Sequence, residues 1–315
     1  MNQDSASGNP ASPPPVWSVA AGAAGEPPPD RPLPEAGIAP WLAGDPAIEW
    51  RIANPLARGE TAGWSCVASE AVCLATLSIT ARDADAADLA RRAYRQLLEL
   101  REALAFPHVL RVWHYLSDIN AGDGDAERYK RFCQGRLEVL RDHPSLLDRM
   151  PAATVVGSQL PGLHLKCLLT RIPPQPLENP RQVRAYDYPR RYGPSRPAFA
   201  RAARMAWSPA STQLFISGTA SILGHETRHA GDVGAQLNES LANVATLLET
   251  AGAPFAGKGL ATLEHLIIYL RDPADIELVK TVIAAQLPTG LAWTCRQADL
   301  CRRDLLVEVE ALATA

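Results

Sequence analysis

The same order of secondary-structure elements is predicted twice along this chain, and this repeat constrains the fold more than any other feature. In the first half, strand-like runs alternate with amphipathic helical segments in the order strand, helix, strand, helix, strand, strand. The second half repeats this order, and Tyr115-Leu116-Ser117-Asp118 corresponds to Tyr269-Leu270-Arg271-Asp272 at the end of the strand between the helices. We therefore expect an α+β fold of two homologous modules, each a mixed sheet with two helices on one face.

The helix starts are marked by capping residues. Asp85 is the expected N-cap of a helix that continues to Leu104, Asp232 opens a helix that continues to Ala251, and Asp272-Pro273 opens a further one. Residues 126–142 form the remaining predicted helix. Strands are predicted at residues 73–80, 109–117, 154–158, 163–170, 214–218, 265–271, 293–300 and 305–312.

Proline is concentrated at the N-terminus, where 11 of the 27 prolines fall in the first 46 residues among alanine, glycine and serine. Such a segment buries too little apolar surface to order itself, so residues 1–40 are expected to be a flexible tail. The N-terminal module is then expected at residues 41–172. The C-terminal module is expected at 173–315, including a connecting segment rich in arginine and tyrosine.

Composition and charge exclude several classes of function. The net charge of −3 gives no general attraction to nucleic acid or to an anionic membrane. Residues 205–224 lack formal charges but are too polar to span a bilayer, and the N-terminus has no secretory signal pattern. The six cysteines form no CxxC pair and are expected to be thiols. We expect a cytoplasmic monomer that needs no metal or other cofactor.

The connecting segment, residues 173–204, carries seven arginines and three tyrosines against only Glu178 and Asp187. Arginine binds carboxylates through two parallel hydrogen bonds, and tyrosine adds hydroxyl donors, so the segment suits a small polyanionic ligand. A solvated basic linker is the equally acceptable alternative on composition alone.

Residues 225–229 spell HExxH, the signature of zinc proteases, in which two histidines one helical turn apart bind the metal. That chemistry requires a helix, but Gly224 and Gly231 flank the motif and the apolar periodicity begins only at Val233. We therefore expect a loop that leads into a helix, and no metal site.

Residues 214–243, LFISGTASILGHETRHAGDVGAQLNESLAN, resemble the reactive-intermediate deaminase (Rid) family, and residues 307–313 resemble its final strand. A closer resemblance extends over most of the folded chain, in the blocks LRVWHYLSDIN, ERYKRFCQGR, PAATVVGS, PLENPRQVRAYDYPRRYGP, FISGTASILGH and ADLCRRDLLVEVE. These blocks are similar to the chorismatases, which remove pyruvate from chorismate. The resemblance implies two tandem Rid-like (chorismate-mutase-like) modules with the site between them.

The resemblance also implies roles for individual residues. Arginines of the family hold the two carboxylates of chorismate, and a glutamate on the last strand transfers a proton. The matching positions are Glu308 for the acid, Tyr188 and Tyr192 for an aromatic pocket, and, for the carboxylates, Arg136, Arg181 and Arg296.

The substrate that the resemblance implies, an enol ether, sets a requirement on Glu308. Cleavage of an enol ether begins when an acid protonates its methylene carbon, so the glutamate must stay protonated near pH 7. Burial and neighbouring negative charge raise a carboxyl pKa in the required direction. The alternative is a carboxylate that points outward from the sheet, because Leu306, Glu308, Glu310 and Leu312 share one mixed face.

Cys301 and Gly218 resemble the aromatising branch of the family, which implies 3-hydroxybenzoate as product, alone or with 4-hydroxybenzoate. Cys301 then either steers the intermediate or is a buried packing thiol. The alternatives are a hydrolytic chorismatase that forms a cyclohexadiene diol, a Rid-like imine deaminase, and a non-catalytic binder of aromatic or pterin-like metabolites. A dioxygenase has little support, because no iron-binding triad is recognisable.

Overall fold

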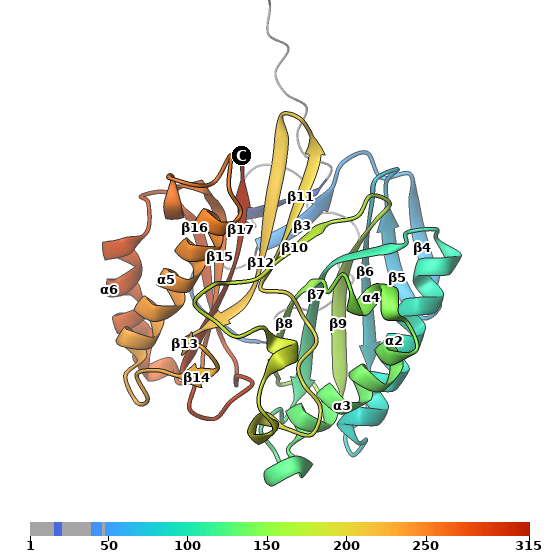
Figure 1. Cartoon of the computed structure of the whole chain (residues 1–315), viewed down its shortest axis with the longest axis horizontal. Coiled ribbons are helices and arrows are strands. Elements are labelled where there is room, and N and C mark those ends of the chain that lie inside the picture. The colour runs from blue at the N-terminus through green and yellow to red at the C-terminus, as the bar shows by residue number, and fades with distance from the viewer. Residues whose placement is uncertain (1–15, 21–38, 46–47) are drawn as a thin grey trace, which may run out of the picture.

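The computed structural model describes residues 16–20, 39–45 and 48–315. Figure 1 shows two sheets at the centre of the molecule, with α5 and α6 outside one sheet and α2 and α3 outside the other. Each half of the chain builds one sheet and its covering helices. The predicted α+β arrangement of two similar modules is therefore confirmed.

The N-terminal sheet is mixed, since β7 and β8 are parallel and the other neighbours are antiparallel. Its strand order is β4-β5-β6-β9-β7-β8, so that β8 forms an edge. Its elements are β4 Ala57–Thr61, β5 Trp64–Ala68, β6 Val72–Ile79, α2 Ala86–Ala103, β7 His108–Ser117, α3 Arg128–Arg141, α4 Pro144–Leu147, β8 Ala152–Ser158 and β9 Leu163–Thr170. A single 3-10 turn, η1 Gly124–Ala126, precedes α3.

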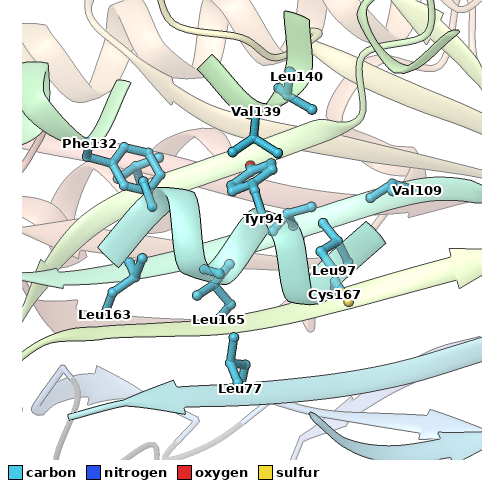
Figure 2. Packing of buried hydrophobic residues seen from close by; sticks show 14 of the residues in the cluster. Leu77, Tyr94, Leu97, Val109, Phe132, Val139, Leu140, Leu163, Leu165 and Cys167 are labelled. Atoms are coloured by element: carbon cyan, nitrogen blue, oxygen red, sulfur yellow. The ribbon is translucent and has the colours of Figure 1, made fainter. Parts of the chain in front are cut away.

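Helix α2 illustrates why the sequence folds locally as predicted. The side chain of Asp85 accepts hydrogen bonds from the backbone N–H groups of Ala87 and Asp88, which stabilises the start of the helix. Residues on one stripe, including Leu97, are buried against the sheet. Figure 2 shows Tyr94 and Leu97 packed together with side chains from α3 and from the underlying strands.

The C-terminal sheet has the strand order β10-β11-β12-β17-β15-β16-β2, and β15 and β16 are parallel. Its elements are β2 Trp41–Gly44, β10 Gln175–Leu177, β11 Ala202–Ser208, β12 Ser211–Ala220, α5 Val233–Thr250, β15 Leu263–Leu270, α6 Ile276–Gln286, β16 Ala292–Gln297 and β17 Val307–Thr314. Short elements connect these: β13 Ile222–Leu223, β14 Glu226–Thr227, η2 Ala185–Asp187, η3 Arg190–Tyr192, η4 Gly259–Thr262 and η5 Pro273–Asp275. Asp232 caps α5, and Asp272 caps η5 immediately before α6, as the sequence indicates.

Two of the expected boundaries differ from the structure. β2 pairs with β16, so residues 41–44 extend the C-terminal sheet instead of the N-terminal module. Val16–Ala20 forms β1, which pairs with β3, Ile48–Ile52. This part of the expected flexible tail is therefore a strand, and its two valines and one tryptophan are residue types that are common in strands. Residues 1–15 and 21–38 of that tail lie outside the described residues.

The two sheets pack face to face. One buried cluster joins Trp113, Val156 and other side chains of the N-terminal sheet to Phe215 and Tyr269 of the C-terminal sheet. The helices of each module cover the opposite faces, where two further clusters form. Side chains that point from either sheet toward the other are thus removed from solvent, and this layer contains the polar groups described next.

Candidate active site

Glu308 lies in β17 and points toward the N-terminal sheet. It is directly opposite Ala220 of β12 and Tyr269 of β15, and only 4% of it is exposed. A Cβ atom at Gly218 would lie 2.1 Å from Oε1 of Glu308, so a residue larger than glycine leaves no room for the carboxyl group in this position. The structure therefore brings together Gly218 and Glu308, both predicted site residues.

The surroundings of Glu308 favour its protonated form. Burial, together with the neighbouring carboxylate of Glu310, raises the pKa of Glu308 to about 8, while Arg111 and Arg201 act in the opposite direction. An acid with this pKa is mostly protonated at neutral pH and still able to release a proton. Glu308 is thus a buried carboxyl group that favours its protonated form, and not a carboxylate that points outward.

Glu310, on the same face of β17, is bound by the N-terminal module. Arg111 Nη2 and Trp113 Nε1 each donate to its carboxylate at 2.8 Å, and the hydroxyl of Thr154 donates at 2.5 Å. The Thr154 hydroxyl in turn accepts from the backbone N–H of Gly218 at 3.0 Å. These bonds connect the two modules. They also fix the position of the Glu310 carboxylate, whose negative charge raises the pKa of Glu308.

Cys301 lies in the loop between β16 and β17 and packs against both the helix-side cluster of the N-terminal module and the cluster between the sheets. Burial and the nearby Glu308 carboxyl raise the pKa of the Cys301 thiol to about 12. It is therefore a thiol at neutral pH, which suits a residue that shapes the site better than a nucleophile.

Arg201 and the predicted tyrosines approach the site from the connecting segment. Arg201 Nη2 donates to the hydroxyl of Tyr188 at 2.8 Å and to the carbonyl of Val183 at 2.9 Å. The rings of Tyr188 and Tyr192 lie 5.3 Å apart between centroids, and the Arg302 guanidinium lies over both. Arg201 Nε is buried and has no hydrogen-bond partner among the described residues, so it remains able to bind an anion.

Arg136, on α3, is fully buried against the ring of Phe132 at 5.1 Å. None of its guanidinium nitrogens has a hydrogen-bond partner of good geometry within the described part of the chain, although the Tyr94 hydroxyl is nearby. A buried cation without an acceptor is costly, so this guanidinium is suited to an anionic group of a ligand. Phe132 belongs to the helix-side cluster of the N-terminal module, one of the two clusters that Cys301 packs against.

Two of the three arginines predicted to bind the carboxylates, Arg181 and Arg296, already have partners within the protein. Arg181 donates to Glu239 at 2.6 Å and to Asn243 at 2.8 Å, so its guanidinium is held by α5, and its role in binding a carboxylate of the substrate stays a prediction. The composition of a segment with many arginines does not distinguish among them. Arg296 is opposite Tyr269 on β16, one strand farther from Glu308, and donates to the carbonyl of Ala39 at 3.1 Å.

The HExxH residues do not form a helix. Glu226 and Thr227 form β14, His229 has a positive φ of 56°, and α5 begins only at Val233. His225 Nδ1 lies 2.9 Å from Arg191, and His229 lies 3.5 Å from Glu239. The prediction that this motif lies outside a helix is confirmed, and the geometry required of a zinc protease is not present in these residues.

Comparisons with known proteins are consistent with this geometry. Residues 49–169 match the family model described as chorismatase FkbO/Hyg5-like, N-terminal, and residues 198–315 match the model described as endoribonuclease L-PSP. A chorismatase of Streptomyces hygroscopicus is 34% identical over 269 residues, which cover 84% of this chain and 78% of the relative.

This chain belongs to the chorismatase family. A relative from Streptomyces hygroscopicus named 3-hydroxybenzoate synthase is 37% identical over 231 residues, which cover 70% of this chain and 68% of that protein. A crystal structure of a chorismatase superposes with a TM-score of 0.78 at 33% identity and covers 87% of this chain and 85% of that one. The resemblance inferred from the sequence blocks is confirmed.

Sequence reasoning did not assign roles in this chorismatase to Arg111, Arg201 or Glu310. The sequence does contain one signal: Arg111 is the single arginine in a largely apolar strand, LRVWHYL. The structure buries it. Charged residues are rarely buried without a partner, so such an arginine indicates a buried acid opposite it.

No helix among the described residues is long and apolar enough to cross a membrane.

Proposed function

We propose that this chorismatase-family chain removes pyruvate from chorismate and converts the ring to 3-hydroxybenzoate, with Glu308 as the proton donor. The observation that carries the proposal is the protonated, buried Glu308 beside Gly218 and near Cys301. The name of the relative that is 37% identical, 3-hydroxybenzoate synthase, supports the same product.

In the first step, Glu308 donates its proton to the methylene carbon of the enolpyruvyl group. The enol ether becomes an oxocarbenium ion, and Glu308 becomes a carboxylate. General acid catalysis of this kind contributes about 10²- to 10⁴-fold to a rate, so positioning of the dianion must contribute as well. We assign that positioning to Arg136 and Arg201, whose buried guanidinium nitrogens include unpartnered ones among the described residues.

In the second step, the adjacent ring hydroxyl attacks the ring carbon that carries the ether oxygen. The carbon–oxygen bond breaks, its electron pair stays on the departing oxygen, and pyruvate leaves as a ketone. The hydroxyl proton returns to Glu308, directly or through water. The oxygen of the resulting arene oxide takes up a proton as the three-membered ring opens, and the ring then loses a proton from carbon to give 3-hydroxybenzoate. No water is consumed overall, because chorismate contains the atoms of pyruvate plus hydroxybenzoate.

The neutral thiol of Cys301 fits a role in shaping the pocket around the intermediate, and Gly218 leaves space for Glu308. We also propose that the protein acts as a monomer, because the two modules of one chain can close the site between them. The six cysteines are all free, which supports a reducing compartment such as the cytoplasm.

The test is pyruvate release from chorismate, followed through a coupled lactate dehydrogenase assay with a chelator present, and chromatography of the ring product. We expect pyruvate and 3-hydroxybenzoate in equal amounts. If no pyruvate forms, the proposal is wrong. If pyruvate forms together with a cyclohexadiene diol, the hydrolytic alternative is correct.

A further inference from the structure

The two modules differ most clearly in the connection that leads into their last strand. In the N-terminal module, residues 159–162 join β8 to β9, whereas residues 298–306 join β16 to β17 and carry Cys301. Ser117 closes the shorter connection: its backbone N–H donates to Gly162 O at 3.0 Å, and its hydroxyl accepts from Gly162 N–H at 2.9 Å. The longer connection, which we call the Cys301 loop, needs a different means of support.

Arg271 stands at the position of the repeat where the N-terminal module has Ser117. Its backbone N–H donates to Leu306 O at 2.9 Å, which matches the bond from Ser117 to Gly162. Its side chain extends farther: Nε donates to Leu305 O and Nη2 to Arg302 O, both at 2.9 Å. Nη1 also forms an ion pair with Asp299. One guanidinium therefore binds the beginning, the middle and the end of the Cys301 loop.

The N-terminal module holds the same loop from the other side. Asn120 Nδ2 donates to Leu300 O at 2.9 Å, and Asn120 Oδ1 accepts from Arg271 Nη1 at 3.2 Å. The backbone N–H of Gly157, on edge strand β8, donates to Asp299 O at 2.7 Å. A Cβ at Gly157 would lie 3.0 Å from the Cβ of Asp299, so the glycine permits this close approach. Leu300 and Cys301 are thus fixed between the two modules.

We propose that Arg271 and Asn120 are positioning residues that hold the Cys301 loop in place relative to Glu308, and that they thereby determine which ring product forms. The proposal rests on the proposed function, because it assigns Cys301 to the pocket in which the ring intermediate partitions. Neither residue is expected to contact the substrate. Losing either one should change the product ratio and the accessibility of Cys301 more than the affinity for chorismate.

The experiment measures two quantities in Arg271→Met. One is the rate at which maleimide labels Cys301, determined by mass spectrometry; the other five cysteines are buried, so the half-buried Cys301 reports on its own loop. Removal of several charge-assisted hydrogen bonds should increase loop opening and the labelling rate about tenfold or more. The other quantity is the share of 3-hydroxybenzoate among the products, which should fall while KM for chorismate changes little.

Two further variants calibrate the effect. Arg271→Lys keeps the charge but not the set of bonds and should give an intermediate labelling rate. Arg171→Met is the matched control, since Arg171 also donates to two backbone carbonyls, Glu70 O and Ala105 O, at the opposite end of the N-terminal sheet. It should leave both measurements unchanged.

The proposal is overturned if folded Arg271→Met labels at the wild-type rate and forms the wild-type products. If Arg271→Met does not fold, Asn120→Ala replaces it and should show the same changes at smaller size; wild-type behaviour there also overturns the proposal. Failure of the proposed function is distinguishable, because wild-type protein would then release no pyruvate, whereas the labelling rates would still test the support of the loop.

Discussion

The N-terminal and C-terminal modules carry basic and acidic side chains, respectively, at equivalent positions of their last strands. Tyr115 is opposite His164 in the first module, and the equivalent Tyr269 is opposite Glu308 in the second. Two residues farther along, Lys166 in β9 corresponds to Glu310 in β17. The same backbone therefore presents a neutral or cationic face in one module and an acidic face in the other.

This difference shows how a repeated fold can become a single asymmetric site. Between the packed sheets, the N-terminal module contributes donors, of which Arg111, Trp113 and Thr154 bind Glu310. The C-terminal module contributes the acids and the Cys301 loop. Only the C-terminal copy carries the two acids, and the other copy supplies the groups that hold Glu310 beside Glu308.

The largest expected effect comes from the acid itself. Glu308→Gln keeps the size of the side chain but removes its transferable proton, so kcat should fall by about 10²- to 10⁴-fold with KM nearly unchanged. The coupled pyruvate assay measures both constants. His164→Gln, at the equivalent position of the N-terminal module, is the control and should retain turnover. Equal losses in the two variants would remove the functional distinction between the modules.

The next effect concerns the contact between the modules. Arg111 and Glu310 form an ion pair in which both side chains are at least 97% buried, and breaking such a pair costs about 3–5 kcal/mol. Arg111→Met should therefore lower the free energy of unfolding by about that amount in denaturant titrations. Arg181→Met breaks the more exposed pair with Glu239 and should cost about 1 kcal/mol or less. A similar loss in both variants would contradict a special role of the buried pair.

A smaller effect is expected on the pH profile. Catalysis needs protonated Glu308, so kcat/KM of the wild type should fall as the pH rises through about 8. Glu310→Gln removes the neighbouring negative charge and leaves Arg111 uncompensated, and both changes lower the pKa of Glu308. The alkaline decline should then begin at lower pH, and activity on the alkaline side should fall about tenfold for every pH unit by which the decline moves. Glu239→Gln should leave the profile in place.

The smallest change in overall rate is expected for Cys301→Ala. The thiol is neutral and is not needed for proton transfer, so pyruvate release should decrease only a few-fold, by the scale of a lost packing contact. The product mixture should nevertheless shift away from 3-hydroxybenzoate, as chromatography will show. An unchanged mixture would mean that Cys301 is only a packing residue, as the buried cysteines of the N-terminal core are.

The sequence was sufficient for most of the fold because its signals are local. Asp85 and Asp232 cap the helices that follow them, and the apolar period identifies the buried stripe of each helix. The pairing of β2 with β16 was not predictable, since it joins segments far apart in the sequence. No local pattern specifies such an edge.

The site was predicted only in part, because only some of its residues lie in recognisable local sequence blocks. Glu308, Gly218 and Cys301 follow from the sequence blocks that resemble the family, and the structure brings them together. The expectation for Arg181 follows from the resemblance to the family, and a sequence motif cannot show that Glu239 pairs with its guanidinium. Arg111 and Glu310 depend on the packing of two sheets, so their partnership becomes visible only when both modules are in place.

The central claim is that Glu308 is protonated at neutral pH, and infrared difference spectroscopy tests it most directly. The spectrum of wild-type protein minus that of Glu308→Gln should contain the carbonyl band of a buried carboxylic acid at about pH 6.5, below the pKa of about 8. That band should disappear as the pH is raised through about 8, while a carboxylate band appears. A difference spectrum that contains only carboxylate bands at the lower pH would contradict the account.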